Sequence, residues 1–138
     1  MIVRAATPEE LPWLVNRVGI VPPLDLRGIV ALDSSGRIRG MVGCCSWTHN
    51  SCEVHVSADT PIAWKHLAPA ASEYLFRQLG LGVVVGRVRS SNKAARRANE
   101  HLGFRLAHTI KDGYAVGEDM LLYEMRREDC RYTTKEAA

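Results

Sequence analysis

The stretch VVVGRVRSSNKAARRANEHLGF, residues 83–104, contains the two elements that decide the fold. Val83 to Val88 is an apolar run of the kind that forms a buried strand. Asn92 can accept a hydrogen bond from the first turn of a helix, which then continues to His101 and ends at Gly103. A buried strand that leads through a short loop into a helix indicates a layered fold of helices and sheet.

The segment before this stretch places a second helix and a second strand beside it. A helix that begins at Pro61, capped by Asp59 or Thr60, continues to the break at Gly80. The preceding strand, Cys52 to Val56, alternates between apolar and polar residues. Because a helical crossover joins parallel strands, this strand is expected to lie parallel to Val83 to Val88.

The two ends of the chain supply the remaining elements. Ile2 to Ala6 predicts a strand, and Thr7-Pro8 begins a helix that stops near Gly19. A hairpin and a closing strand complete the series, with the ranges Gly28 to Leu32, Arg39 to Trp47 and Asp119 to Met125. The order predicts an α+β (α/β layered) fold, in which helices flank a mixed central β-sheet, in one domain over residues 1–138.

Composition narrows the classes of function. The 138 residues are 46% hydrophobic and carry a net charge of +3, which suits an anionic cofactor without resembling a nucleic-acid-binding protein. The four cysteines show no paired C-x-x-C spacing, so no metal site is expected. The N-terminus lacks the pattern of a secretory signal and no apolar run reaches membrane-spanning length, so a cytoplasmic protein with no membrane partner is expected.

The segment from Val88 to Phe104 resembles the second conserved block of the GNAT superfamily of N-acetyltransferases. That block reads V-x-x-x-N-x-x-A, then a helix, then L-G-F, and Val88, Asn92, Ala95 and the final Leu-Gly-Phe match it. The element order also agrees, so the resemblance covers nearly the whole chain, and small phage and prophage members are similar. It implies a sheet splayed between its two central parallel strands, with acetyl-CoA as cosubstrate in the gap. The acetyl group would pass directly to a primary amine of an unidentified small molecule or protein.

The family's pyrophosphate loop is altered in this chain. Its R/Q-x-x-G-x-G/A pattern falls at residues 61–66, which read PIAWKH and contain neither glycine. Glycine lets phosphates approach the backbone, so only part of an amide cradle is expected, with Lys65 as a compensating charge. Trp64 either stacks on the adenine or packs in the core. The resemblance assigns cofactor binding to Val56, Ser57, Ile62, Ala63, Trp64, Lys65, Asn92, Lys93 and Arg96.

Several of these assignments have structural alternatives. Asn92 is expected to contact the pantetheine arm, and it can also cap the helix that follows it. Lys93 and Arg96 could meet phosphates or simply be solvated helix charges.

The catalytic candidates lie on the strand Cys52 to Val56. Acetyl transfer needs a base for the amine and an acid for the departing thiolate. Glu53 is the leading base, because many family members carry a glutamate on this strand, and His55 on the same face is the substitute. The alternative is that both residues form the solvated face of a half-exposed strand.

The general acid is not identified by the sequence. The family's usual tyrosine position holds Asn99, which leaves Tyr114, Tyr123, His101 or water. A thiol nucleophile at Cys44, Cys45 or Cys52 is conceivable, although buried cysteines are more often core residues.

Other hypotheses stay open beside acetyl transfer. A catalytically silent CoA-binding or protein-interaction module would explain the altered loop and the missing tyrosine. Nucleic-acid binding through a basic cluster is disfavoured, because no aromatic residues are interleaved with Arg87, Arg89, Lys93, Arg96 and Arg97. The short segment before the second strand, where many relatives carry much of the acceptor pocket, leaves acceptor recognition undetermined, and a partner subunit in a homodimer could complete the pocket.

Overall fold

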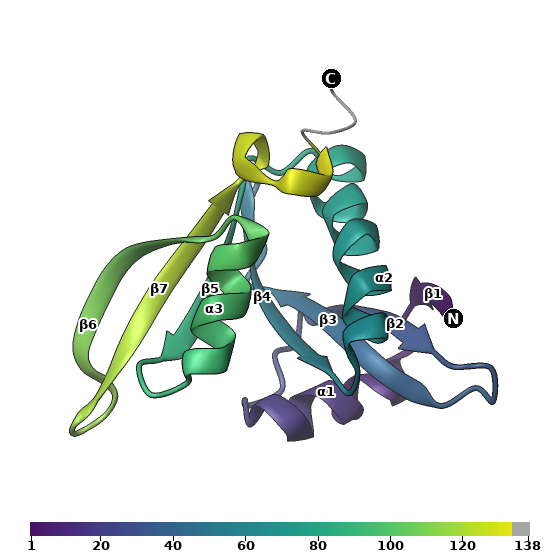
Figure 1. Cartoon of the computed structure of the whole chain (residues 1–138), viewed down its shortest axis with the longest axis horizontal. Helices are drawn as coiled ribbons and strands as arrows, with labels where there is room; N and C mark the ends of the chain where they lie inside the picture. The colour runs from purple at the N-terminus through teal and green to yellow at the C-terminus, as the bar shows by residue number, and fades with distance from the viewer. Residues whose placement is uncertain (134–138) are drawn as a thin grey trace.

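The computed structural model describes residues 1–133, which form one mixed sheet with helices on both faces (Figure 1). The sheet order is β1-β2-β3-β4-β5-β7-β6, and only β4 and β5 are parallel neighbours. The strands are β1 (Ile2–Ala5), β2 (Arg27–Leu32), β3 (Ile38–Cys45), β4 (Ser51–Ala58), β5 (Val83–Arg89), β6 (Arg105–Ala115) and β7 (Glu118–Arg126). The α-helices are α1 (Leu11–Val18), α2 (Pro61–Ser72) and α3 (Lys93–Leu102). The predicted fold class and the parallel pair are confirmed.

The helix ends follow the sequence signals. Thr60 caps α2 by accepting a hydrogen bond from the Ala63 amide at 3.1 Å, and Asn92 caps α3 in the same way through Ala95. Gly103 ends α3 at a φ of 110°, a left-handed conformation that favours glycine. A single turn of 3-10 helix, Pro8–Glu10, precedes α1, so the first helix begins later than Thr7-Pro8 predicted.

Two regions differ from the expected elements. Pro69 lies inside α2, and the chain continues from it into a π-helical segment, Glu73–Gln78, before it reaches Gly80. Proline lacks the amide hydrogen that an α-helix needs, and local π geometry accompanies such disruptions. The second region is β6, an edge strand of 11 residues, all exposed, which gives the sequence no apolar pattern by which its bounds could be predicted.

The two faces of the sheet hold separate cores. A Cβ placed on Gly43 would meet Leu14 of α1, whereas one placed on Gly40 would meet Leu67 of α2. Since these glycines lie three residues apart on β3, α1 and α2 cover opposite faces. The α1 core is small and consists of Leu14, Val30, Leu32 and Met41. Trp13 packs against it.

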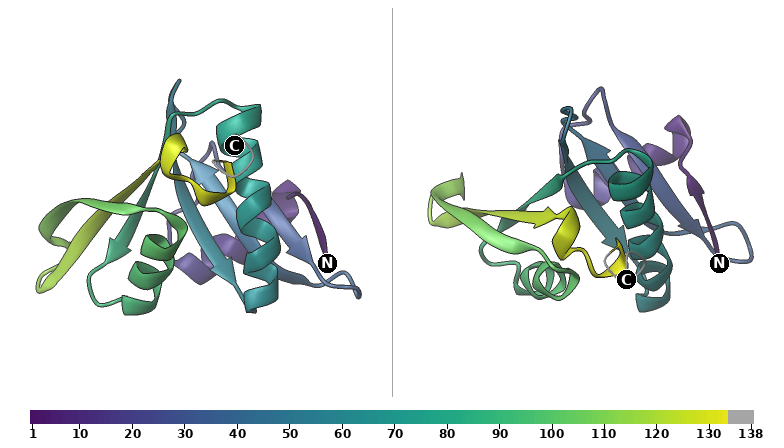
Figure 2. Two further views of the ribbon diagram at one scale, coloured as in Figure 1. Left: turned by 45° about the horizontal axis from the view of Figure 1, so that its top comes forward. Right: turned by 90° about the horizontal axis from the view of Figure 1, so that it is seen from above.

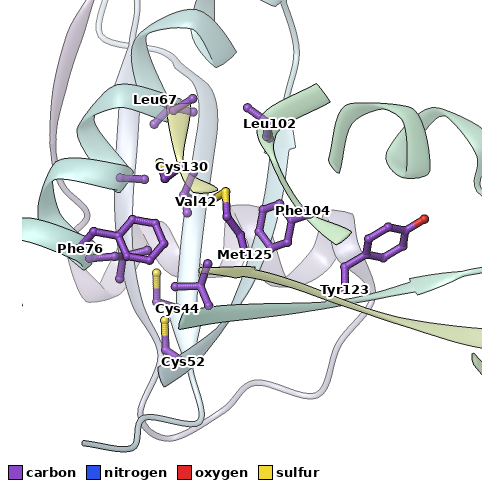
Figure 3. Packing of buried hydrophobic residues seen from close by; sticks show 14 of the residues in the cluster. Val42, Cys44, Cys52, Leu67, Phe76, Leu102, Phe104, Tyr123, Met125 and Cys130 are labelled. Atoms are coloured by element: carbon purple, nitrogen blue, oxygen red, sulfur yellow. The ribbon is translucent and has the colours of Figure 1, made fainter. Parts of the chain in front are cut away.

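The larger core lies on the face of α2 and α3. It includes Leu67, Phe76, Leu102 and Phe104, with Cys44 and Cys52 below Phe76 (Figure 3). All four cysteines are at most 2% exposed, which agrees with their interpretation as core residues.

The sheet divides into two parts that meet at β4 and β5 (Figure 2). Strands β1 to β4 carry α1 and α2, while β5, β7 and β6 carry α3 (Figure 1). No helix among residues 1–133 is long and apolar enough to cross a membrane.

Glu10 anchors the turn that leads into α1. Its carboxylate accepts hydrogen bonds from Arg4 at 2.8 and 3.0 Å and from the Thr7 amide at 2.8 Å. The Arg4 hydrogen bonds, together with the one from Thr7, lower the pKa of Glu10 to about 2 from an ordinary value of 4.5. A carboxyl group whose pKa is lower in the folded than in the unfolded chain stabilises the fold at pH values above its unfolded-state pKa. This contribution is lost as the pH falls toward 2, the pKa of Glu10 in the folded state.

We expect Glu10→Gln to lower the free energy of unfolding at pH 7 by about 1–2 kcal/mol, a figure reduced for solvent screening. Urea unfolding at several pH values should show the variant and the wild-type converging as the pH falls from about 5 toward 2. Glu9→Gln is the control and should stay within about 0.5 kcal/mol of the wild-type. A difference that persists unchanged at low pH would contradict the electrostatic origin.

Candidate functional site

The pairing of β4 with β5 ends early. Three residue pairs are in register, Ser51 with Val83, Cys52 with Val84 and Glu53 with Val85. Both strands continue beyond the last pair, to Ala58 and Arg89. We call the point where they separate, after Glu53 and Val85, the fork. The splayed arrangement predicted for the two parallel strands is therefore present.

A cleft of about 1110 Å³ opens at the fork. Its lining includes Arg17 and Ile20 from the α1 side of the sheet, and Ala71 and Phe76 from the α2 side. Because lining residues come from both faces, the cleft passes through the gap between β4 and β5.

Two helix N-termini lie beside the carboxyl ends of these parallel strands. α2 begins at Pro61, three residues after β4 ends, and α3 begins at Lys93, four residues after β5 ends. Helix N-termini carry a partial positive charge and free amides, which favour anions. The charged residues of the lining are Arg17, Arg87, Arg89 and Asp59. Each arginine is paired with a carboxylate, namely Asp59, Glu53 and Glu118 in turn, so the two helix N-termini are the main feature of the cleft that favours an anionic ligand.

The N-terminus of α2 offers fewer free backbone amides to a phosphate than an intact pyrophosphate loop would. Pro61 has no amide hydrogen, and the amides of Ala63 and Trp64 already bond to Thr60. This leaves Ile62 as the residue of the first turn whose amide can meet a phosphate. The loss of the two glycines thus reduces the phosphate contacts that the backbone can make.

The predicted cofactor residues divide into two groups. Those that line the cleft are Val56, Ser57, Trp64 and Asn92. Those that do not line it are Ile62, Ala63, Lys65, Lys93 and Arg96. Ala63 is fully buried against the sheet, and the Arg96 guanidinium donates to the Ser90 carbonyl at 3.4 Å, so neither side chain faces the gap.

Glu53 is buried at the fork and hydrogen-bonded from two sides. Its Oε1 lies 2.8 Å from His55 Nε2 and accepts from Arg87 Nε and Nη2 at 3.1 and 2.8 Å. The hydrogen bonds from His55 and Arg87 hold the pKa of the Glu53 carboxyl below its ordinary value, although burial acts in the opposite direction. Glu53 is only 8% exposed, so its interpretation as part of a solvated face is wrong.

His55 lines the cleft, and Glu53 does not. With Nε2 as the donor to Glu53, a neutral imidazole carries its lone pair on Nδ1 and can accept a proton there. A carboxylate that fixes one ring nitrogen orients the ring and selects its tautomer. The pair can therefore place a base at the fork, with His55 facing the ligand and Glu53 behind it.

Sequence reasoning missed the partners that hold this region in place. Arg87 pairs with Glu53, and Arg89 pairs with Glu118 at 3.3 Å. Glu118 also accepts from the Ser91 amide and hydroxyl at 3.0 and 2.6 Å, which fixes the loop before α3. The arginines were assigned only to a basic cluster, because their partners lie 29 residues or more away in the sequence. Their pairing with carboxylates leaves less free charge for nucleic acid.

The candidate general acids are dispersed. Tyr114 lines the cleft and lies under the Arg89 guanidinium, 4.3 Å from it. Tyr132 also lines the cleft, and sequence reasoning missed it. The Tyr123 hydroxyl is buried and points to Glu100, while His101 contacts Arg131 at the surface. Tyr114 and Tyr132 thus line the cleft, whereas the predicted candidates Tyr123 and His101 do not.

Comparison with known proteins identifies the fold. No protein-family model matches the sequence, and no curated protein matches it. Solved structures do match, and several are of spermidine N-acetyltransferase SpeG from Vibrio cholerae. A point mutant of that enzyme superposes with a TM-score of 0.77 and 18% sequence identity, over 99% of each chain. Another structure of the enzyme, described as dodecameric and in an intermediate state, superposes with a TM-score of 0.73 and 16% sequence identity. The match covers 92% of this chain and 94% of that one.

A structure of spermidine/spermine N-acetyltransferase SpeG in complex with manganese ions gives a TM-score of 0.74 and 16% identity, over 97% and 95% of the chains. At this level of identity the likeness is one of fold. The chain has the fold of these spermidine N-acetyltransferase structures, which agrees with the fold that the resemblance in residues 88–104 implied.

Proposed function

We propose that this protein is an N-acetyltransferase that transfers the acetyl group of acetyl-CoA directly to a primary amine. The observation that carries the proposal is the fork, where a cleft crosses the sheet between two parallel strands that have stopped pairing. A cosubstrate can then enter from the face of α2 and α3, while an acceptor approaches from the face of α1. The acyl group would lie between them, next to Glu53 and His55.

The chemistry of the cleft suits the parts of acetyl-CoA. Its apolar wall, which includes Ala71, Leu75 and Phe76, would pack against the pantetheine chain. The strand edges that face each other beyond the fork could pair with pantetheine amides, because exposed backbone groups require partners. The arginines and the two helix N-termini would hold the phosphates. Asn92 and Trp64 remain proposed contacts from the cleft lining.

In the proposed reaction His55 is the base and Glu53 is a positioning residue. His55 would accept the proton of the attacking amine, and the carboxylate of Glu53 would orient the ring and stabilise its charge. This reverses the order expected from sequence, in which Glu53 was the leading base. The change follows from the lowered pKa of Glu53 and from its place behind His55. Tyr114 or Tyr132 would supply the proton for the CoA thiolate.

The acceptor is proposed only as an amine, and polyamines are the first class to test. The similar structures are of spermidine N-acetyltransferases, which motivates spermidine as the first compound. The cleft lining of this chain contains more arginine than carboxylate, which disfavours a polycation at that surface. A comparison of spermidine with a monoamine would decide whether a second positive charge helps or hinders.

Calorimetric titration with acetyl-CoA tests the first step of this proposal. We expect micromolar binding of acetyl-CoA and of CoA, and much weaker binding of ATP, because only the first two can occupy the gap at the fork as well as the phosphate site. Equal affinity for ATP would indicate a generic phosphate site. Binding of acetyl-CoA without acetylation of any amine would instead support the silent CoA-binding module that the narrow amide cradle allows.

The assignment of the base predicts unequal effects of two substitutions. His55→Gln should lower kcat by about 100-fold or more and leave the KM for acetyl-CoA nearly unchanged, because a base acts in the transition state. Glu53→Gln keeps the shape and one acceptor oxygen, so it should lower kcat less. His108→Gln, at an exposed position on β6, is the matched control. A loss in Glu53→Gln as large as that in His55→Gln would make Glu53 the base.

Asn92 is proposed to act both as a helix cap and as a cofactor contact, and two variants separate these roles. Asn92→Ala should lower the free energy of unfolding by about 1 kcal/mol, while Asn92→Ser should restore most of it, since serine also caps helices. If Asn92 also contacts the cofactor, Asn92→Ser will retain stability and still bind acetyl-CoA more weakly. Thermal unfolding and titration on the same samples give both values. If Asn92→Ser binds acetyl-CoA with the affinity of the wild-type protein, Asn92 acts as a helix cap and not as a cofactor contact.

A further inference from the structure

Cys45 joins Glu53 and His55 in a cluster that acetyl transfer does not explain. Cys45 lies directly opposite Glu53 in the pairing of β3 with β4, on the same face of the sheet. The Sγ of Cys45, a carboxylate oxygen of Glu53 and a ring nitrogen of His55 all lie within 4.8 Å of one another. Cys45 is 2% exposed and Glu53 is 8% exposed. Three different side chains that can bind metals therefore converge from two neighbouring strands.

The three ligand types match the preferences of zinc. Thiolate, imidazole and carboxylate are its usual ligands, and three protein ligands leave a fourth position for water. Zn–N and Zn–O bonds of about 2.1 Å and Zn–S bonds of about 2.3 Å place tetrahedral ligand atoms about 3.3–3.6 Å apart. The Glu53–His55 contact is 2.8 Å, and no pair in the cluster exceeds 4.8 Å.

Charge and burial also permit a cation here. Metals bind cysteine as the thiolate, so Cys45 must give up its proton when a metal binds. On binding, the thiol proton leaves to solvent, and the thiolate and Glu53 together balance the two charges of Zn²⁺. The Arg87 guanidinium, whose side chain is 50% exposed, is the group that would have to yield part of its contact with Glu53. Both of its hydrogen bonds use Oε1, the oxygen that also lies 2.8 Å from His55 Nε2, so a metal between Glu53 and His55 would compete with them.

We propose that Cys45, Glu53 and His55 form a reversible site for a thiophilic divalent cation, Zn²⁺ in particular, and that its occupation stops acetyl transfer. The binding of the ion stands on the cluster alone, whereas the inhibition rests on the proposed function, because the metal would bind both the proposed base, His55, and its positioning residue, Glu53. Mn²⁺ and Mg²⁺, which prefer oxygen ligands, should bind much more weakly.

Titration of the reduced full chain with Co²⁺ tests the site directly. We expect a near-ultraviolet thiolate-to-cobalt absorption band that saturates at one ion per chain and disappears when Zn²⁺ is added. Cys45→Ala should abolish this band and weaken Zn²⁺ binding by at least about tenfold, since even outer-shell changes cost that much. Cys44→Ala is the matched control, because Cys44 is adjacent, equally buried and on the other face. Absence of a band in the wild-type protein, or its survival in Cys45→Ala, would overturn the proposal.

A measurement on the unsubstituted protein covers the case in which Cys45→Ala does not fold. The ¹¹³Cd resonance of the cadmium-loaded protein reports the number of sulfur ligands, and one is expected. Two sulfurs would place the ion at Cys44 and Cys52 and contradict the proposal, as would none.

The activity assay then examines the consequence separately. Micromolar Zn²⁺ should inhibit the wild-type enzyme by more than about tenfold and should inhibit Cys45→Ala far less, relative to the variant's own rate. Equal inhibition of both proteins would refute control through this cluster. If no amine is acetylated under any condition, the proposed function fails, while the cobalt and cadmium experiments still decide whether the metal site exists.

Discussion

The hydrogen bonds between β4 and β5 are the constraint on which the rest of the structure depends. Three residue pairs hold the two parts of the sheet together, and the strands then separate. A longer ladder would close the cleft, and a shorter one would leave Glu53 without a partner on β5, although it would still pair with Cys45 of β3. The last pair, Glu53 with Val85, therefore fixes where the cleft begins and also which side chain stands at its end.

The position of Glu53 explains why a carboxylate can be buried in this sheet. Burial of an unpaired charge is costly, so a residue such as Glu53 needs partners with opposite charge or hydrogen-bond donors. Arg87 satisfies it from β5 and His55 from the same strand. The ionic contact thus crosses the fork and tethers the two strands at the point where their backbones stop pairing. Catalysis and structure share the same carboxylate in the proposed function.

Much of the fold could be predicted, because local signals agreed with the overall architecture. The caps at Thr60 and Asn92, the alternation in Cys52 to Val56 and the apolar run in Val83 to Val88 each specify their own element. The long strand β6 could not be bounded, since an exposed edge strand has no buried face to impose alternation. The π-helical segment after Pro69 likewise depends on packing that the local sequence does not record.

The candidate site could be predicted only in part. The face shared by Glu53 and His55 followed from the period of a strand, but the contacts of Arg87 and Cys45 depend on register between strands, which a single sequence does not specify. The expectation of no metal rested on cysteine spacing along the chain. That test has no bearing on a cluster such as Cys45, Glu53 and His55, whose members are brought together by strand pairing.

The division of the sheet has a consequence for the mechanics of the molecule. The part that carries α1 and α2 and the part that carries α3 are joined through a short ladder and a shared core, so the gap between them is the natural place for bending. A molecule bound across the gap would contact both parts of the sheet and hold them together. By binding the native state, it would stabilise that state by an amount that increases with its concentration. In the proposed function, the concentration of acetyl-CoA would then set the stability of the native state as well as the rate of acetylation.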